Sequence, residues 1–152
     1  MAFARLGDNQ RAWQLFDLIN PVNHAKSAAA VAAYKVEPYV VAADVYALSP
    51  HIGRGGWTWY TGSAGWMYRL ITESLLGLRL EVDRLHFEPC LPAGWAGFKM
   101  HYRYRETVYH IAILQGPGEA AMTIDGAPRP FGAIPLVDDG REHMVELRLG
   151  RS

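Results

Sequence analysis

The sequence has no excess of charge, a single cysteine and no long apolar run, and each absence excludes a class of protein. Fifteen basic residues balance fifteen acidic ones, so the chain lacks the positive surface that binds nucleic acid or an anionic membrane. Cys90 has no second cysteine with which to form an internal disulfide, which fits a reducing compartment. No stretch of eighteen apolar residues occurs, so no transmembrane helix is expected.

The N-terminal segment MAFARLGDNQ has no apolar core of the kind that a signal peptide contains. We therefore expect a soluble, cytoplasmic chain, with any attachment of a larger parent protein to the inner membrane made through other regions. A helical pattern begins within the first ten residues without an ordered lead-in. This start suggests a fragment of something larger.

The first half of the chain has the period of helices. Asp8 is a good N-cap for a helix whose apolar residues recur at helical spacing and which ends at Pro21. The apolar residues that follow Ser63 repeat with a wide buried face, so this helix is the clearest of the set. Further helices are expected over the alanine-rich segment 26–35 and over EPYVVAADVYAL, residues 37–48.

The second half of the chain has the alternating period of strands. In KMHYRYR, the residues Met100, Tyr102 and Tyr104 fall on one side and the basic residues on the other. Several similar short runs follow, separated by turns such as Asp125-Gly126. We expect an α+β chain with helices over residues 1–79 and an antiparallel β-sandwich over residues 80–152.

The six histidines show neither the pairing at helical spacing nor the neighbouring cysteine that zinc sites use. No metal site is therefore expected. The four histidines of the second half should lie on solvated strand faces: His86, His101, His110 and His143. Serine hydrolase chemistry is also disfavoured, because Ser63 lies in T-G-S-A-G and not in a nucleophile elbow.

His24 differs from the other histidines because it follows the helix-stopping Asn20-Pro21 in a short turn. A side chain there can project from a fixed base into a site. A capping or packing role suits the same position, and the sequence leaves both open.

The stretch GRGGWTWYTGSAGW, residues 53–66, holds three tryptophans and five glycines. Aromatic rings stack on the apolar face of sugars, while nearby polar groups satisfy the hydroxyls. Trp57 and Trp59 supply such rings, and Arg54 supplies hydrogen bonds. Packing of the same rings in a core between domains is the alternative.

Gly62 stands directly before the helix that begins at Ser63. Free backbone N–H groups at a helix N-terminus attract anions, and glycine lets an anion approach closely. The sequence therefore suggests a phosphate near Gly62, although no lysine of a phosphate-binding loop accompanies it.

Four ordered motifs resemble a known family. They are FDLINPVNHA (16–25), YKVEPYVVAADVY (34–46), GRGGWTWYTGSAGWMYR (53–69) and EPCLPAGWAGF (88–98). Together they resemble the C-terminal part of the cellobiose phosphorylase family, glycoside hydrolase family 94, in particular the branch at the C-terminus of cyclic β-1,2-glucan synthases. The resemblance covers nearly the whole chain. It implies the last helices of an (α/α)6 barrel followed by a small β-sandwich.

In that family, inorganic phosphate attacks the anomeric carbon with inversion while an aspartic acid protonates the leaving oxygen. The family's phosphate pocket uses a histidine in an N-P-x-x-H context and a threonine-glycine pair in a W-x-T-G context. The resemblance places these roles on His24, Thr61 and Gly62. It also favours sugar contact for Trp57 or Trp59.

The sequence departs from the family pattern in two respects. The phosphate-binding glutamine that follows the E-P-Y segment is replaced by the run from Val41 to Asp44. The family's catalytic aspartate, like an arginine of the phosphate site, lies upstream of anything in this chain, so no catalytic residue is assigned here. Glu37, beside Pro38, is expected to orient neighbours or to contact sugar.

The resemblance implies a part of a glycosyltransferase or glycoside phosphorylase that acts on β-glucans. Its partners would be a β-glucan oligosaccharide, phosphate and the absent barrel segment, with phosphate as co-substrate, no other cofactor and no nucleic acid. Two alternatives stay open, a carbohydrate-binding module without chemistry and a truncated gene product without function.

Overall fold

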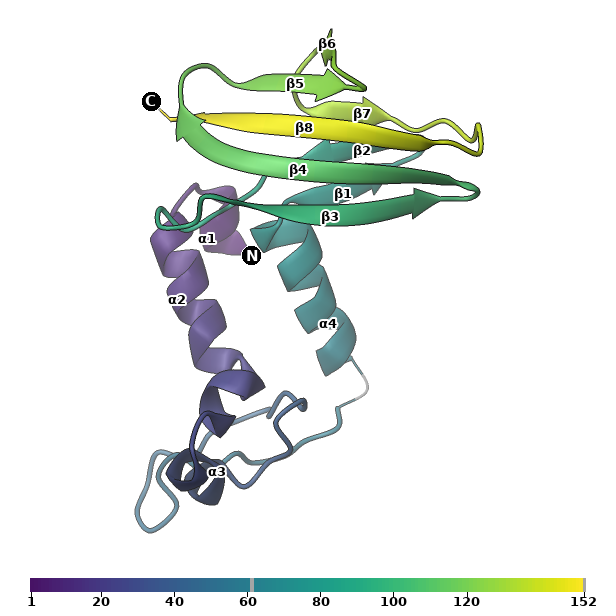
Figure 1. Cartoon of the computed structure of the whole chain (residues 1–152). Helices are drawn as coiled ribbons and strands as arrows, with labels where there is room; N and C mark the ends of the chain where they lie inside the picture. Colours follow the sequence, from purple (N-terminus) through teal and green to yellow (C-terminus); the bar gives the residue numbers. More distant parts are fainter. Residues whose placement is uncertain (61, 152) are drawn as a thin grey trace. The chain divides into compact units, whose positions relative to one another are not determined.

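The computed structural model describes residues 1–60 and 62–151, except for the side chain of Arg151. The chain divides into two compact units, Met1–Leu75 and Leu76–Ser152. The first holds the helices and the second the strands (Figure 1). The α+β fold class expected from the sequence is confirmed.

The helical unit begins with α1 (Ala2–Arg5) and α2 (Asn9–Ile19). Asp8 caps α2 as expected, since its carboxylate accepts a hydrogen bond from the backbone N–H of Arg11 at 3.0 Å. The 3₁₀ turn η1 (Pro21–Ala25) then leads to α3 (Ala28–Tyr34). In α2 only Ala12 is fully buried.

The helix α4 (Ser63–Arg69) continues into η2 (Leu70–Leu75), a wider π-type segment. It runs in the direction opposite to α2 (Figure 1). The face expected to be widely buried is only half-buried along most of its length, and Trp66 is exposed. Leu75, at the end of η2, is the fully buried residue of this segment.

The prediction of a helix over residues 37–48 is wrong. This segment is irregular, and it pairs with residues 53–57 through an isolated antiparallel bridge between Val45 and Gly55. Backbone hydrogen bonds from Ala43 N to Trp57 O (2.8 Å) and from Tyr46 N to Arg54 O (2.9 Å) extend the pairing. Partners distant in sequence thus satisfy backbone groups that a helix would have satisfied locally.

The second unit packs two sheets face to face (Figure 1). A three-stranded sheet has the order β1-β2-β7, formed by β1 (Leu78–Glu81), β2 (Arg84–Phe87) and β7 (Ala133–Pro135). The other sheet has the order β3-β4-β8-β5-β6. Its strands are β3 (Gly97–Tyr104), β4 (Thr107–Pro117), β5 (Ala121–Ile124), β6 (Ala127–Arg129) and β8 (Glu142–Arg151).

The core of this sandwich follows the alternation seen in the sequence. On β4, the residues Tyr109, Ile111 and Ile113 are buried while their neighbours are more exposed. They pack against residues of the other sheet, such as Phe87 and Ile134. Most strand pairs are antiparallel, as expected, but β4 and β8 at the centre of the larger sheet run parallel.

The strand unit requires a glycine near its first residue. Gly77 has a φ of +71°, and a Cβ at this position would lie 2.2 Å from the backbone of Glu88. The boundary predicted from the sequence, between residues 79 and 80, lies four residues after the division between Leu75 and Leu76.

Candidate sugar and phosphate site in the helical unit

Residues 53–57 pair with the segment 37–48 to form a two-stranded ribbon, and two glycines allow close packing beneath it. A Cβ at Gly55 would lie 2.4 Å from Cγ2 of Val36, and a Cβ at Gly56 would lie 2.3 Å from Oδ1 of Asp44. The same Asp44 oxygen accepts a hydrogen bond from the backbone N–H of Trp57 at 3.2 Å. The two glycines therefore serve close packing.

Two of the residues predicted to bind substrate come together although they derive from different motifs. The indole Nε1–H of Trp59 donates to Oε1 of Glu37 at 3.4 Å. The ring of Tyr39 stands edge-on to Trp59, with the centroids 6.2 Å apart. Tyr39 was not singled out by the sequence reasoning, and its place directly after Glu37-Pro38 was the available signal.

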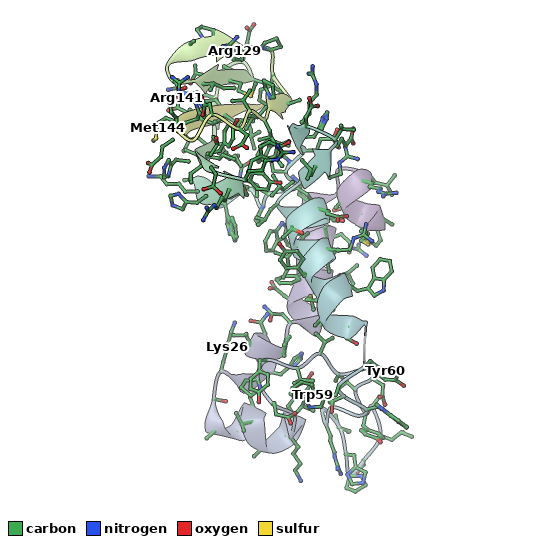
Figure 2. All side chains as sticks on the ribbon, turned by 90° about the vertical axis from the view of Figure 1, so that its right-hand side faces the viewer. Lys26, Trp59, Tyr60, Arg129, Arg141 and Met144 are labelled. Carbon is green, nitrogen blue, oxygen red and sulfur yellow. The ribbon has the colours of Figure 1, made fainter. Side chains whose placement is uncertain are left out.

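The other predicted tryptophan lies beside a different aromatic residue. Trp57 and Tyr60 have ring centroids 6.0 Å apart, and Trp57 is 71% exposed. Trp59 is 67% exposed, and both Trp59 and Tyr60 belong to the segment that leads into α4 (Figure 2). Aromatic faces open to solvent beside a carboxylate acceptor are the elements from which sugar sites are built.

Arg54, the remaining residue predicted to contact substrate, contributes its backbone to the ribbon. Its carbonyl accepts from Tyr46, and its own N–H donates to the carbonyl of His51 at 3.0 Å. These bonds hold the backbone of Arg54 in place within the turn that connects the two paired segments, and the side chain extends from there.

Of the three residues predicted to bind phosphate, the structure describes His24 and Gly62. Thr61 lies outside the described residues. Gly62 is the N-cap of α4, and no side chain caps this helix end. A largely apolar cavity of ≈ 590 Å³ is lined by Gly62, Ser63, Tyr60 and other residues of the helical unit. A second cavity of ≈ 390 Å³ is lined by residues that include Trp59 and Tyr39.

His24 is held by contacts with residues other than Gly62. Its Nε2–H donates to the carbonyl of Leu18 at 2.8 Å, and its ring stacks on Tyr34 with the centroids 4.5 Å apart. Burial raises the pKa of Tyr34, and a hydrogen bond with the backbone of Ala42 opposes that rise. With Nε2–H engaged, only the Nδ1 side of the His24 ring is left for a ligand.

The two acidic residues of the segment 37–48, Glu37 and Asp44, act as hydrogen-bond acceptors in the structure. Glu37 accepts from an indole and Asp44 from a backbone amide. Across the described residues there is no cluster of three or more histidine, cysteine or acidic side chains that could hold a metal ion. Nor do those residues include a helix with the length and apolar character needed to cross a bilayer.

Three of the four C-terminal histidines are less solvated than expected. The side chains of His86, His110 and His143 are 29%, 24% and 14% exposed, while His101 is exposed as expected. Each of the three lies beside a carboxylate, His86 by Glu81, His110 by Glu142 and His143 by Asp125. Sequence alternation placed these residues on strands, but it did not reveal the acidic partners that cover them.

Two family models divide the chain. Residues 1–77 match the glycosyl hydrolase 94 superfamily, catalytic domain, and residues 78–130 match the glycosyl hydrolase family 65, C-terminal domain. The change from one model to the other falls close to the division between the helical and strand units.

Curated relatives agree with the first model. Cyclic beta-(1,2)-glucan synthase NdvB of Rhizobium meliloti is 43% identical over 84% of this chain and 5% of the synthase. N,N'-diacetylchitobiose phosphorylase of Vibrio furnissii is 32% identical over 99% of this chain and 19% of that enzyme. For 1,2-beta-oligoglucan phosphorylase of Listeria innocua, the identity is 26% over 85% of this chain and 13% of the enzyme.

The chain thus spans no more than about a fifth of these relatives' length. The match over residues 1–77 covers half of the chain, and it agrees with the four motifs and with the helical and strand units. The chain belongs to the glycosyl hydrolase 94 superfamily.

Proposed function

We propose that this chain supplies sugar and phosphate contacts to the site of a larger glycoside phosphorylase or glycosyltransferase that acts on β-glucans. The reaction would be an inverting phosphorolysis or its reverse, with phosphate attacking the anomeric carbon and a general acid outside this chain protonating the leaving oxygen. The β-1,2 linkage is suggested by the names of the glucan synthase and the oligoglucan phosphorylase.

The observation that carries this proposal is the bond between Glu37 and Trp59. The two residues come from the E-P-Y motif and from the tryptophan-rich motif, 22 positions apart, and both were expected to contact substrate. Their contact forms an aromatic face with a carboxylate at its edge. A sugar ring would stack on the indole while Glu37 accepted a hydroxyl.

The phosphate part of the proposal assigns His24, Thr61 and Gly62. Because Nε2–H of His24 donates to Leu18, a phosphate oxygen would be met by Nδ1, which donates only when the ring is protonated. Gly62 would offer its backbone at the start of α4. Phosphate is then a co-substrate, and the single buried cysteine is the reason for placing the protein in the cytoplasm.

A second candidate function is sugar binding without chemistry. The exposed tryptophans of residues 53–60 favour it, because stacking needs no catalytic acid. On this view the chain is a carbohydrate-binding module, and removal of Trp57 or Trp59 would abolish all of its measurable activity.

The test has two stages. The chain alone, incubated with a β-1,2-glucooligosaccharide and phosphate, should release no glucose 1-phosphate, while calorimetry should detect binding of the oligosaccharide. Release of glucose 1-phosphate would place the general acid within this chain and contradict the proposal. Absence of binding, or binding that is unchanged in Trp59→Ala, would contradict both candidate functions.

The second stage uses a full-length parent enzyme that contains this sequence. His24→Ala and Thr61→Val should raise the KM for phosphate more than the KM for the sugar, while Trp59→Ala should do the reverse. If the phosphate dependence is unchanged in both of the first two variants, His24 and Thr61 are not phosphate ligands.

A further inference from the structure

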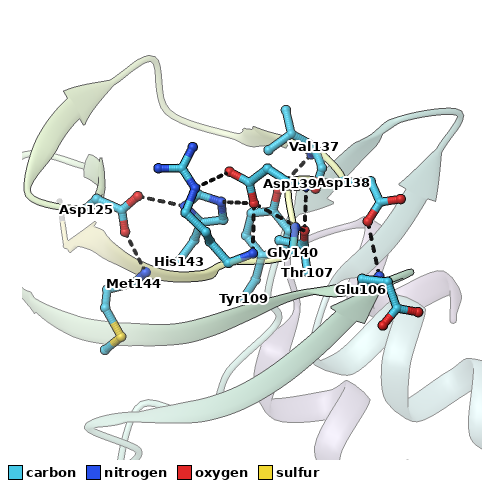
Figure 3. A network of polar contacts seen from close by, with 11 residues as sticks. Glu106, Thr107, Tyr109, Asp125, Val137, Asp138, Asp139, Gly140, His143 and Met144 are labelled. Carbon is cyan, nitrogen blue, oxygen red and sulfur yellow. Dashed lines mark hydrogen bonds and ion pairs between the residues drawn. The ribbon is translucent and has the colours of Figure 1, made fainter.

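His143 lies in the β-sandwich between two carboxylates that come from different turns (Figure 3). Its Nδ1 is 2.7 Å from Oδ2 of Asp125, in the turn between β5 and β6. Its Nε2 is 3.3 Å from Oδ1 of Asp139, in the segment between β7 and β8. A neutral imidazole carries one N–H, so only the doubly protonated ring donates to both carboxylates.

The segment that carries Asp139 is also attached to β4. The hydroxyl of Thr107, which is fully buried, accepts from the backbone N–H of Asp139 at 2.8 Å and of Gly140 at 2.9 Å. The hydroxyl of Tyr109 accepts from the backbone N–H of Val137 at 2.8 Å. The segment 137–141 therefore has fixed anchors on β4 and one anchor on β8 that depends on a proton.

The other ring N–H of His143, on Nδ1, connects the ring to the β5–β6 turn. Oδ1 of Asp125 accepts from the backbone N–H of Met144 at 2.8 Å, while its other oxygen meets His143. The His143 ring also stacks on Tyr109, with the centroids 5.1 Å apart. One imidazole thus joins the β5–β6 turn, the 137–141 segment and β4.

We propose that His143 is a pH-sensitive latch, which in its imidazolium form ties Asp139 of the 137–141 segment to the β5–β6 turn and in its neutral form gives up the bond to Asp139. The shorter contact retains the single remaining N–H, so the neutral ring keeps Asp125. Its Nε2 lone pair then faces Oδ1 of Asp139, and an attractive contact becomes a repulsive one.

Charged and titratable groups of both signs surround the ring. They are Tyr109 on β4, Asp125 in the β5–β6 turn, Arg129 on β6, and Asp139 and Arg141 in the 137–141 segment. The bond to Asp125 raises the pKa of His143, burial opposes that rise, and Asp139 adds to it. The latch therefore opens above the usual histidine value of about 6.5.

Opening of the latch would change the charge on the wall of a nearby cavity. A cavity of ≈ 310 Å³ is lined by Tyr109, Asp125, Val137 and His143, among others. Val137 stays bonded to Tyr109 on β4. The part of the wall that changes with the proton is therefore the His143 ring itself, which loses its positive charge.

The latch can be tested by NMR titration of the full chain from pH 5 to 9. The Cε1–H resonance of His143 should titrate with a midpoint above 6.5, and the amide resonances of residues 137–141 should move with the same midpoint. Hydrogen-exchange protection of the Arg141 amide, which donates to Oδ1 of Asp139 at 3.0 Å, should fall across that midpoint. Segment amides that do not follow the titration of His143 would overturn the proposal.

Three variants separate the latch from a merely structural histidine. Asp139→Asn should lower the midpoint of His143 and abolish the pH dependence of the segment amides, while Asp125→Asn should lower that midpoint further. His86→Gln, on the other sheet, is the matched control and should leave the segment's response unchanged. An unchanged His143 midpoint in Asp139→Asn would refute the latch, and because the wild-type titration needs no variant, misfolding of a variant cannot hide a failure.

Discussion

The indole Nε1–H of Trp59 donates to the carboxylate of Glu37, with 3.4 Å between Nε1 and Oε1. We predict that Glu37→Ala moves the indole Nε1–H resonance of Trp59 in a proton–nitrogen NMR spectrum and leaves that of Trp57 in place. Because the bond is exposed, the free energy of unfolding should fall by less than about 1 kcal/mol. Equal shifts of both indole resonances would mean that Glu37 acts on the whole ribbon and not on Trp59 alone.

Gly56→Ala should destabilise the helical unit. The added methyl would meet Oδ1 of Asp44 at 2.3 Å and displace it from the backbone N–H of Trp57, so we expect a loss of about 1–3 kcal/mol. Gly65→Ala is the control, since no atom lies within 4 Å of its Cβ position in α4. Alanine there should stabilise the helix by up to about 1 kcal/mol. Chemical denaturation measures both, and similar effects would disprove the packing argument.

Ile111→Ala should cost the sandwich about 2–5 kcal/mol, because it removes a fully buried side chain from β4. Leu80→Ala, at a position that is 52% exposed on β1, should change the free energy of unfolding by no more than about 0.5 kcal/mol. The comparison is made by urea denaturation monitored on the strand unit. A large loss for Leu80→Ala would show that β1 is covered by another surface in solution.

The stability of the sandwich should depend on pH in two directions. The hydrogen bond from His143 is the main cause that lowers the pKa of Asp125. The hydrogen bond from the backbone N–H of Arg141 is the main cause that lowers the pKa of Asp139. The contribution of the two carboxyls is complete above about pH 3.9 and is lost as the pH falls through the lowered values. The pKa of His143 is raised, so its contribution is complete below about pH 6.5 and is lost as the pH rises through the raised value.

Denaturation midpoints of the chain should therefore be highest between about pH 4 and 6.5. His143→Gln should remove the decline on the alkaline side, and Asp125→Asn should reduce the decline on the acid side. A midpoint for the strand unit that stays constant between pH 6 and 9 would contradict the assigned direction for His143.

Local patterns were sufficient for much of the fold. Asp8 capped its helix because an N-cap depends on residues three positions away, and the strands formed where side chains alternated. The helix expected over 37–48 failed because its favourable spacing competed with hydrogen bonds to residues 53–57. Those bonds depend on Gly55 and Gly56 packing against Val36 and Asp44, and spacing along one segment carries no information about them.

The sequence by itself determined the change from helical to strand period, the capped first helix, the sandwich and the motifs of the family. Only the tertiary structure decided that Glu37 meets Trp59 and that the Nε2–H of His24 donates to Leu18. It also decided that His143 lies between Asp125 and Asp139, 18 residues before it and 4 residues before it. Period and capping arise from neighbours in the chain, whereas these contacts arise from turns that bring separate segments together.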